Sequence, residues 1–425
     1  YMSGIQNGAV LDTGSDYNAI SLSTMIGNTQ YGLQLVSADS NTVTQSYIRG
    51  GSIGSYLSSG SDYNAISLST MIGSAAYGLS FFGSAWNTLT QNVAQGGNSG
   101  IVLGSGSDYN VISLSSMTGN GQYGLNLSGA STNTVTRSWM SGNDHGAYLD
   151  TNADRNTISL STMTNAHASL PALYIRVSSA NVVHSSYVQG STAAVVSGST
   201  GTIINSSMLV ATNIAGTALA LQADSLSLTV TSTTLRGGPI GRGLLLDVGN
   251  SGVVSIGSVT VTGSKRGLEI SAQNTGFILA IDSITFRGLT AGATAIHYLA
   301  GTHVSTFTLA NFEDTTINTN VSGAALWAGS RISMYANYGV RTGSTYENDP
   351  SSFVDWEAGP YPGCVVTNNV GAGQIYSTIQ SAINALPTTL TGHSCVVIRD
   401  GATYAEQVTV KNFTNNGSSI TILAD

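Results

Sequence analysis

The sequence predicts an all-β fold, a right-handed parallel β-helix (solenoid) with about 23 residues per coil. Three observations support this fold class: a repeat of constant length, an alternation of apolar and polar residues inside the repeat, and a surface that is poor in charge. Because 425 residues exceed the usual size of a single compact core, an elongated array of coils is a natural organisation for the chain.

The repeat is defined by an asparagine that is followed, two positions later, by Ile, Val or Leu. This asparagine recurs at a constant interval, and sequence identity is highest at twice that interval, since GSDYNAISLSTMIG at 14–27 returns unchanged at 60–73. The duplicated unit is therefore a pair of coils, clearest in residues 1–165. Repeats of about 20–25 residues fit one coil of short strands, whereas helical repeats need about 33 or more. The predicted ladder asparagines are Asn18, Asn41, Asn64, Asn87, Asn110, Asn133 and Asn156.

Apolar and polar residues alternate within each repeat, as in a strand with one buried face. Ile20 and Leu22, then Leu33 and Leu35, are expected to point inward and to stack into columns with their equivalents in neighbouring coils. The ladder asparagine is expected to take the left-handed conformation of a tight turn and to bond the next asparagine through its amide. We predict one β-helix over residues 1–341, about 70 Å long at ~4.8 Å per coil.

Charged residues make up only 8% of the chain, with 13 Lys and Arg against 21 Asp and Glu. A surface of uncharged polar residues suits stacked coils, in which like charges ~4.8 Å apart would repel each other. The net charge of −8 argues against nucleic-acid binding. No apolar run approaches the ~20 residues that span a bilayer, and no motif implies a cofactor. Residue 1 already lies inside a repeat, so we expect the full protein to begin upstream of it.

The composition changes at residues 342–363, where proline, acidic and aromatic residues cluster, and we take this segment as a domain boundary. Beyond it, apolar residues in YSTIQSAINALP keep the spacing of a short amphipathic helix near 377–386. Ser377 or Thr378 offers an N-cap, and Pro387 ends the helix. The remaining sequence predicts three strands.

This order of elements, TIQSAINALP followed by VVIRDGATYAEQVTV and SITI, resembles the opening of pectinesterase-like and other pectin-lyase-fold β-helices. In that family an amphipathic helix caps the N-terminal end, so the resemblance implies that residues 364–425 begin a second, incomplete β-helix. The family's catalytic aspartates and arginine lie in later coils, so no residue here inherits a catalytic role. The repeats themselves resemble the parallel β-helix repeats of very large bacterial surface proteins.

The chain has two cysteines, Cys364 and Cys395, each followed by Val-Val. One interpretation places them on paired strands, joined by a disulfide. The other leaves them as two buried thiols. The histidines are scattered without ligand spacing, so the sequence predicts no metal site.

Five aspartates stand two residues before a ladder asparagine, in a row interrupted by Ala85 and Ser131. They are candidates for weak cation sites, but we favour a structural role in which each bonds its own turn backbone. These residues are Asp16, Asp39, Asp62, Asp108 and Asp154.

Two further motifs contain acids. DTNAD at 150–154 opens like a calcium loop, but Arg155 replaces the required glycine and Ser161 the bidentate glutamate, which argues against calcium. Asp144 and His145 form an acid–histidine pair without a second acid or a basic cluster, and we interpret it as a surface turn.

Aromatic residues follow the aspartate row. Tyr17, Tyr63 and Tyr109 recur at the spacing of the duplicated unit, and Trp86 holds the same position on an intervening coil. If exposed, they would form a strip able to stack on sugar rings and contact a glycan. If turned inward, they are ordinary turn packing, which is the interpretation we favour.

The leading functional hypothesis is a structural or adhesive protein of a bacterial cell surface or extracellular filament, without enzymatic activity. The duplication preserves residues that pack or turn and supplies no catalytic cluster. The expected partner is the chain itself, stacked head to tail through unpaired sheet edges, as a homopolymer or as adjacent β-helix domains. Polysaccharide is a second candidate partner. The alternatives are a pectin lyase-like or pectinesterase-like carbohydrate-active enzyme and a non-catalytic glycan-binding adhesin.

Overall fold

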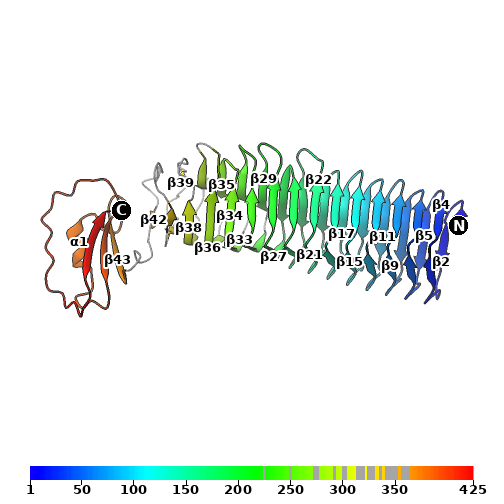
Figure 1. The fold of residues 1–425 in the computed structure, drawn as a ribbon, viewed down its shortest axis with the longest axis horizontal. Helices are drawn as coiled ribbons and strands as arrows, with labels where there is room; N and C mark the ends of the chain where they lie inside the picture. The colour runs from blue at the N-terminus through cyan, green and yellow to red at the C-terminus, as the bar shows by residue number, and fades with distance from the viewer. Residues whose placement is uncertain are drawn as a thin grey trace.

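The fold is taken from a computed structural model, which describes residues 1–223, 225–247, 251–270, 277–290, 293–298, 304–312, 321–322, 331–334, 337–339, 353–355 and 364–424. Figure 1 shows short parallel strands stacked coil upon coil along one axis, starting from the N-terminal strands in blue. Equivalent positions of neighbouring coils pair at the predicted interval, for example Thr70 with Tyr47. The predicted all-β parallel β-helix is therefore confirmed, with about 23 residues per coil.

Each regular coil contributes one longer strand to one sheet and two short strands to another. The first sheet has 14 strands, and all its pairings are parallel. Its strands are β2 (Ala9–Leu11), β5 (Tyr31–Val36), β8 (Ile53–Ser58), β11 (Tyr77–Phe82), β14 (Ser99–Leu103), β17 (Tyr123–Ser128), β20 (His145–Asp150), β23 (Pro171–Arg176), β26 (Thr192–Ser197), β29 (Thr217–Gln222), β32 (Arg242–Leu246), β35 (Arg266–Ile270), β37 (Thr294–Tyr298) and β39 (Val321–Ser322).

The second sheet has 28 strands, which form two columns over most of its length. The first column holds β3 (Ala19–Ser21), β6 (Thr42–Thr44), β9 (Ala65–Ser67), β12 (Thr88–Thr90), β15 (Val111–Ser113), β18 (Thr134–Thr136), β21 (Thr157–Ser159), β24 (Val182–His184), β27 (Thr200–Asn205), β30 (Leu226–Thr231) and β33 (Ser251–Gly257). The second column holds β1 (Met2–Gly4), β4 (Thr24–Gly27), β7 (Tyr47–Gly50), β10 (Thr70–Gly73), β13 (Val93–Gly96), β16 (Ser116–Gly119), β19 (Trp139–Gly142), β22 (Thr162–Asn165), β25 (Tyr187–Gly190), β28 (Met208–Ala211), β31 (Thr234–Arg236) and β34 (Val259–Thr262).

The two columns merge in β36 (Phe277–Arg287), which pairs with both β33 and β34, and in β38 (Val304–Phe312). Three short strands follow: β40 (Arg331–Met334), β41 (Asn337–Gly339) and β42 (Phe353–Asp355). Because β42 pairs with β40, one strand of the β-helix sheet lies inside the predicted boundary at 342–363. The other residues of that boundary lie outside the described part of the chain.

The core consists of columns of inward-pointing side chains that run along the helix axis. Each column is formed by equivalent residues of successive coils. Leu33 and Leu35 are fully buried, as predicted, and so are Val43 and Ile48 from the two short strands of the same coil. Within one coil the longer strand lies so close to the second short strand that some positions accept only glycine: a Cβ on Gly78 of β11 would lie 2.5 Å from the backbone nitrogen of Gln95 of β13.

One inward prediction is wrong. Ile20 packs against the core, but Leu22 is 79% exposed and has a φ of 51°. This left-handed residue forms the bend between the two short strands, and its conformation turns the side chain outward. Leu68 and Leu114 repeat the same geometry in later coils. The strand alternation therefore stops one residue earlier than the sequence pattern suggests.

The asparagine ladder is present, but its geometry differs from the prediction. The left-handed residue is the one before each asparagine, for example Tyr63 before Asn64, with a φ of 57°. From Asn41 onward the asparagine is buried, and its Oδ1 accepts the backbone N–H of the asparagine one coil earlier. The N–H of Asn64 donates to Oδ1 of Asn87 at 2.7 Å, and that of Asn87 to Asn110 at 2.8 Å. The ladder thus satisfies backbone groups that the turn leaves without a strand partner.

From Asn64 to Asn156 the asparagine amides alternate between two acceptors, in step with the duplicated unit. Nδ2 of Asn110 donates to the carbonyl of Ser84 one coil away, whereas Nδ2 of Asn87 donates to Ala85 of its own turn. The predicted amide-to-amide bond occurs at two steps, Asn18 to Asn41 and Asn133 to Asn156. The ladder also continues one coil beyond the prediction, since Asn181 accepts the N–H of Asn156.

A second ladder, which the sequence analysis missed, lies five residues after the first. At each step a backbone N–H donates to the serine hydroxyl, asparagine or threonine oxygen of the next coil. The sequence could have revealed this ladder, because its polar residues recur at the same interval as the ladder asparagines. Its members are Ser23, Ser46, Ser69, Asn92, Ser115, Ser138, Ser161, Ser186, Ser207 and Thr233.

Residues 364–424 form a three-stranded parallel sheet with one short helix. The elements are β43 (Val366–Val370), α1 (Ile379–Asn384), β44 (Ser394–Ile398) and β45 (Ile420–Ala424). The predicted helix is confirmed, with Thr378 as its N-cap. That this unit begins a second β-helix stays a prediction.

Of the three strands predicted after the helix, β44 and β45 form, but the third does not, because residues 401–410 between them have no regular secondary structure. Their polar groups bond to the helix instead. The carboxylate of Glu406 accepts the N–H groups of Ile379 and Gln380, and the side chain of Gln380 bonds both backbone groups of Thr409. The segment therefore serves as an additional cap on α1.

Candidate functional site

The edge between the 14-stranded sheet and the first column of short strands carries the predicted aromatic residues. They occupy the left-handed position of the turn, with φ of 56–58°, which directs each side chain away from the core. Tyr17 is 84% exposed, Tyr63 61%, Trp86 48% and Tyr109 45%. The favoured interpretation, inward turn packing, is therefore wrong. We call these four residues the aromatic edge.

Three rings of the aromatic edge stack on one another along the helix axis. The ring centroids of Trp86 and Tyr109 are 4.2 Å apart with planes 2° from parallel, and those of Tyr63 and Trp86 are 6.2 Å apart at 10°. In the other coils the same position holds Ser40, Thr132, Arg155 and Ala180.

The aspartate row runs beside the aromatic edge. Each carboxylate accepts the backbone N–H at the equivalent position of the next coil, so the prediction that it bonds its own turn is wrong. Oδ1 of Asp16 accepts from Asp39 at 2.7 Å, and Oδ1 of Asp62 accepts from Ala85 at 2.7 Å. The remaining bonds in this direction join Asp39 to Asp62, Asp108 to Ser131 and Asp154 to Ser179.

This aspartate ladder runs opposite to the asparagine ladder, because its acceptors lie on the earlier coil. The backbone bonds explain why acids stand at these positions without an ion. Among the described residues, the aspartates form no cluster of three groups placed to hold one metal ion. A row of acids two residues before the asparagines still gives this edge a negative charge.

A second cluster, missed by the sequence analysis, lies on the outer face of the 14-stranded sheet. His145 is 5% exposed, and its ring lies nearly parallel to those of Tyr123 and Tyr148, at centroid distances of 5.6 and 5.2 Å. Tyr123 and Tyr148 also stack on each other at 4.9 Å, and Tyr174 packs at a tilt against both His145 and Tyr148. The interpretation of His145 as part of a surface turn is therefore wrong, because rings from the coils before and after it cover the imidazole.

Burial sets the protonation behaviour of this cluster. It lowers the pKa of His145 below 6.5, although a hydrogen bond between Nδ1 and the carbonyl of Pro171 and the nearby Asp144 act in the opposite direction. Burial also raises the pKa of Tyr123, with Asp144 adding to the effect. The imidazole is therefore neutral near pH 7, which suits a ring packed between tyrosines.

The candidate calcium loop at 150–154 uses its carboxylates for other contacts. One oxygen of Asp150 accepts the hydroxyl of Tyr148 at 2.9 Å and lies 3.7 Å from the guanidinium of Arg176. Asp154 belongs to the aspartate ladder. A neighbouring cation and a structural hydrogen bond therefore take the place that calcium would need.

The structure joins Cys364 and Cys395 as a disulfide, with Cα atoms 5.9 Å apart, a separation typical of such bridges. His393 lies beside them, so that one nitrogen and the two sulfurs fall within 4.8 Å of one another. The imidazole also contacts the hydroxyls of Ser419 and Thr421. Of the described residues, only these three side chains are grouped closely enough to ligate a metal ion, and the disulfide occupies both sulfurs.

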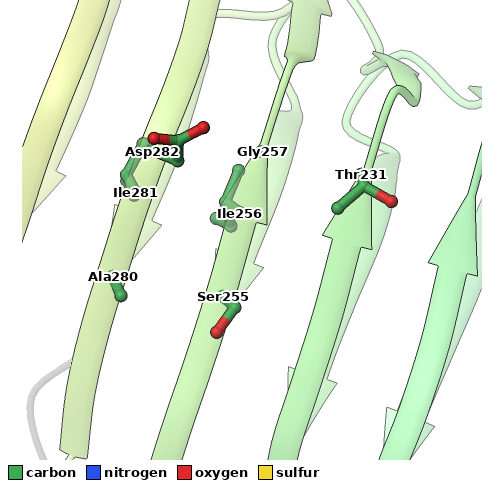
Figure 2. Close-up of a pocket in the computed structure, with 7 residues that line it drawn as sticks. All are labelled: Thr231, Ser255, Ile256, Gly257, Ala280, Ile281 and Asp282. Carbon is green, nitrogen blue, oxygen red and sulfur yellow. The ribbon is translucent and has the colours of Figure 1, made fainter.

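Two further features lie in the later coils. Glu269 is buried and paired with Arg242 and Arg266 on the outer face of the 14-stranded sheet. A depression of about 340 Å³ lies on the other sheet. Figure 2 shows its lining residues, with Thr231 and Asp282 on the strands at either side of β33. Asp282 is the single charged residue of its lining, so the depression offers no pair of acids for hydrolysis.

Comparison with known proteins agrees with the fold. Residues 2–140 match the family described as right handed beta helix region. No curated protein matches the chain. Solved structures of a tailspike protein of the E. coli bacteriophage HK620, a double mutant, are similar. One is 11% identical with a TM-score of 0.27, and the similarity covers 98% of this chain and 72% of the tailspike chain. Another, in complex with a pentasaccharide, is 9% identical with a TM-score of 0.24 and the same coverage.

The family match confirms the predicted right-handed β-helix repeats. It does not extend to residues 364–425, whose resemblance to the start of a pectinesterase-like β-helix stays a prediction. Among the described residues, no helix is long and apolar enough to cross a membrane.

Proposed function

We propose that this chain is a non-catalytic extracellular or cell-surface scaffold that adheres to polysaccharide through the aromatic edge. The observation that carries the proposal is the outward orientation of Tyr17, Tyr63, Trp86 and Tyr109. Aromatic rings combine a large apolar face with little conformational entropy to lose, and they stack on the C–H groups of sugar rings. The β-helix holds these rings at a fixed spacing on a rigid support.

The hydrogen bonds of the acids along this edge support the non-catalytic part of the proposal. Asp16, Asp39 and Asp62 each accept a backbone N–H of the next coil at 2.7–2.8 Å, so one oxygen of each carboxylate is engaged by the backbone. A glycosidase needs one carboxyl group that is protonated near neutral pH and a second at a set distance from it. The hydrogen bonds therefore support a structural and recognition role for these carboxylates.

The extracellular location rests on the disulfide and on the surface. Disulfides persist in oxidising compartments, and Cys364 and Cys395 are paired. Only 8% of the residues are charged, so hydroxyl and amide groups keep the long solenoid in solution. Both features suit a secreted or surface-displayed protein.

Head-to-tail stacking of β-helices, into filaments or within one larger chain, is a second proposal. The asparagine ladder supports it, because each coil donates one N–H to the next coil and accepts one from the coil before it, in the same geometry. A coil from another copy or another β-helix domain would extend this ladder without rearrangement. Concentration-dependent elongation in light scattering tests it, and a protein that stays monomeric at every concentration contradicts it.

Glycan binding is tested with a Tyr63→Ala, Tyr109→Ala double variant. We expect saturable binding of the unmodified chain to surface polysaccharides, at least tenfold weaker in the variant, since two stacking contacts are lost. Trp139→Ala is the matched control, because Trp139 is exposed on β19, away from the aromatic edge. Equal binding by all three proteins contradicts the proposal. Release of new reducing ends from the polysaccharide, with or without calcium, contradicts the non-catalytic role.

A further inference from the structure

The position that carries the aromatic edge is occupied by a ring in some coils and by a small residue in others. Between Tyr17 and Tyr63 the intervening residue is Ser40, half-buried and with the same left-handed φ of 57° as Tyr63. Two coils separate the tyrosines, a rise of ~9.6 Å. We call the open interval above Ser40, with Tyr17 and Tyr63 as its walls, the Ser40 notch.

We propose that the Ser40 notch holds a single neutral pyranose ring, stacked between Tyr17 and Tyr63. The inference rests on the proposed glycan-binding function and deepens it, because it names the position and the class of sugar. The facing sides of Trp86 and Tyr109 already cover each other, so the interval between these two rings is closed to a sugar ring.

The same chain shows that a ring fits this interval. Trp86 occupies the corresponding place between Tyr63 and Tyr109, near-parallel to both rings, with centroid distances of 6.2 and 4.2 Å. The two tyrosines in that interval are again two coils apart. Trp86 therefore occupies the space that a planar or chair-shaped six-membered ring would fill. The Ser40 notch is the equivalent interval without an aromatic side chain in it.

The neighbouring residue changes together with the ring. Where Trp86 fills the interval, the preceding position of the aspartate row is Ala85. Where the interval is open, the preceding residue is polar: Asp39 before Ser40, and Ser131 before Thr132. An interval filled by an aromatic ring needs no polar side chain beside it. A bound sugar ring, in contrast, has hydroxyl groups that need hydrogen-bond partners.

The charge at the Ser40 notch selects the ligand. Asp16, Asp39 and Asp62 stand beside its three residues on consecutive coils, an uninterrupted run of the aspartate row. Carboxylates accept hydrogen bonds from sugar hydroxyls, and they repel a uronate carboxylate or a phosphate. The geometry therefore points to a neutral hexose unit and disfavours acidic polysaccharides and nucleic acids.

Ser40→Trp tests the inference by filling the notch. Trp86 has the same backbone conformation, with a φ of 58°, so a tryptophan is compatible with position 40. The probes are neutral hexasaccharides, including maltohexaose and cellohexaose, with hexagalacturonate as the acidic counterpart, in isothermal titration and saturation-transfer NMR. We expect the unmodified chain to bind a neutral probe and not hexagalacturonate, and the variant to bind that probe at least tenfold more weakly, with an unchanged circular dichroism spectrum.

Trp86→Ser is the reciprocal variant, which opens a second notch between Tyr63 and Tyr109. We expect it to bind more of the same neutral probe than the unmodified chain. Unchanged binding by Ser40→Trp, or weaker binding by Trp86→Ser, overturns the notch. If either occurs while Tyr63→Ala, Tyr109→Ala still loses binding, the aromatic edge binds glycan at another point and the proposed function survives. Preference for hexagalacturonate or for single-stranded DNA also overturns the notch.

Discussion

The regular coils up to about residue 165 and the unit at 364–424 both stack parallel strands, but they are stabilised differently. In the coils after the first, the same small set of contacts recurs: a buried asparagine, a buried serine or asparagine of the second ladder, and columns of apolar side chains. In the C-terminal unit no contact repeats, and the disulfide and the Glu406 contacts to α1 hold it together. Repetition distributes stability over many equal steps, whereas a unit of three strands depends on a few specific links.

The largest expected effect that separates the two regions is reduction of the disulfide. It closes a loop of 31 residues, for which the loss of chain entropy in the unfolded state corresponds to about 3–4 kcal/mol. Under reducing conditions, or in Cys395→Ala, we expect faster amide hydrogen exchange throughout 364–424. The strands β8 to β17 should keep their protection, because no covalent link contributes to them.

The intact chain serves as its own control in this experiment, since both regions are observed in one sample. Equal acceleration of exchange in the coils and in 364–424 would contradict the assignment of the disulfide to local stability. Unchanged exchange in both would show that packing around Val396 and Ile383, and not the bridge, holds the C-terminal unit.

The next effect concerns the ladder itself. Asn110→Ala removes the acceptor for the N–H of Asn87 and the donor to the carbonyl of Ser84, and both partners are buried. Leaving two buried polar groups unsatisfied is expected to cost about 2–3 kcal/mol. Urea denaturation followed by circular dichroism measures the change.

Asn181→Ala is the comparison variant, from the less regular coils that follow residue 165. Asn181 accepts the N–H of Asn156, but its own Nδ2 has no hydrogen-bond partner. Its replacement therefore loses one bond, and we expect about half the effect of Asn110→Ala. A larger effect at Asn181 would show that the irregular coils, and not the repeats, limit the stability of the β-helix.

Much of the fold follows from the sequence because a solenoid repeats its chemistry in register. The constant recurrence of asparagine identified the coils, and alternation placed Leu33 and Leu35 in the core. Alternation failed at Leu22 because leucine rarely adopts a left-handed conformation, and only the stacking of coils enforces one there. For the same reason the outward orientation of Tyr17 was not predicted: a tyrosine beside a turn gives no sign of its φ.

The cluster around His145 was harder to predict than the fold, because its members come from different coils and do not keep the period of the repeat. His145 follows Tyr123 slightly sooner than one repeat, and Tyr174 follows Tyr148 slightly later, so neither pair keeps the period of the ladder asparagines. Their contacts require the strand register, in which Tyr123 pairs with His145 and Tyr148 with Tyr174. Aligning the 14-stranded sheet coil by coil, instead of by a fixed period, would have revealed the cluster.

The smallest expected effect lies in this cluster and depends on pH. Because the pKa of His145 is lower in the folded chain than its ordinary 6.5, the unfolded chain takes up a proton first as the pH falls. Stability is therefore constant above about 6.5 and decreases as the pH falls from there through the folded pKa. We expect the thermal unfolding midpoint to fall between pH 7.5 and 5.5, and this fall to be smaller in His145→Gln. His184→Gln, a change on β24 outside the cluster, should keep the pH dependence of the unmodified chain. If His184→Gln abolishes the dependence and His145→Gln does not, burial of His145 against Tyr123, Tyr148 and Tyr174 is not its cause.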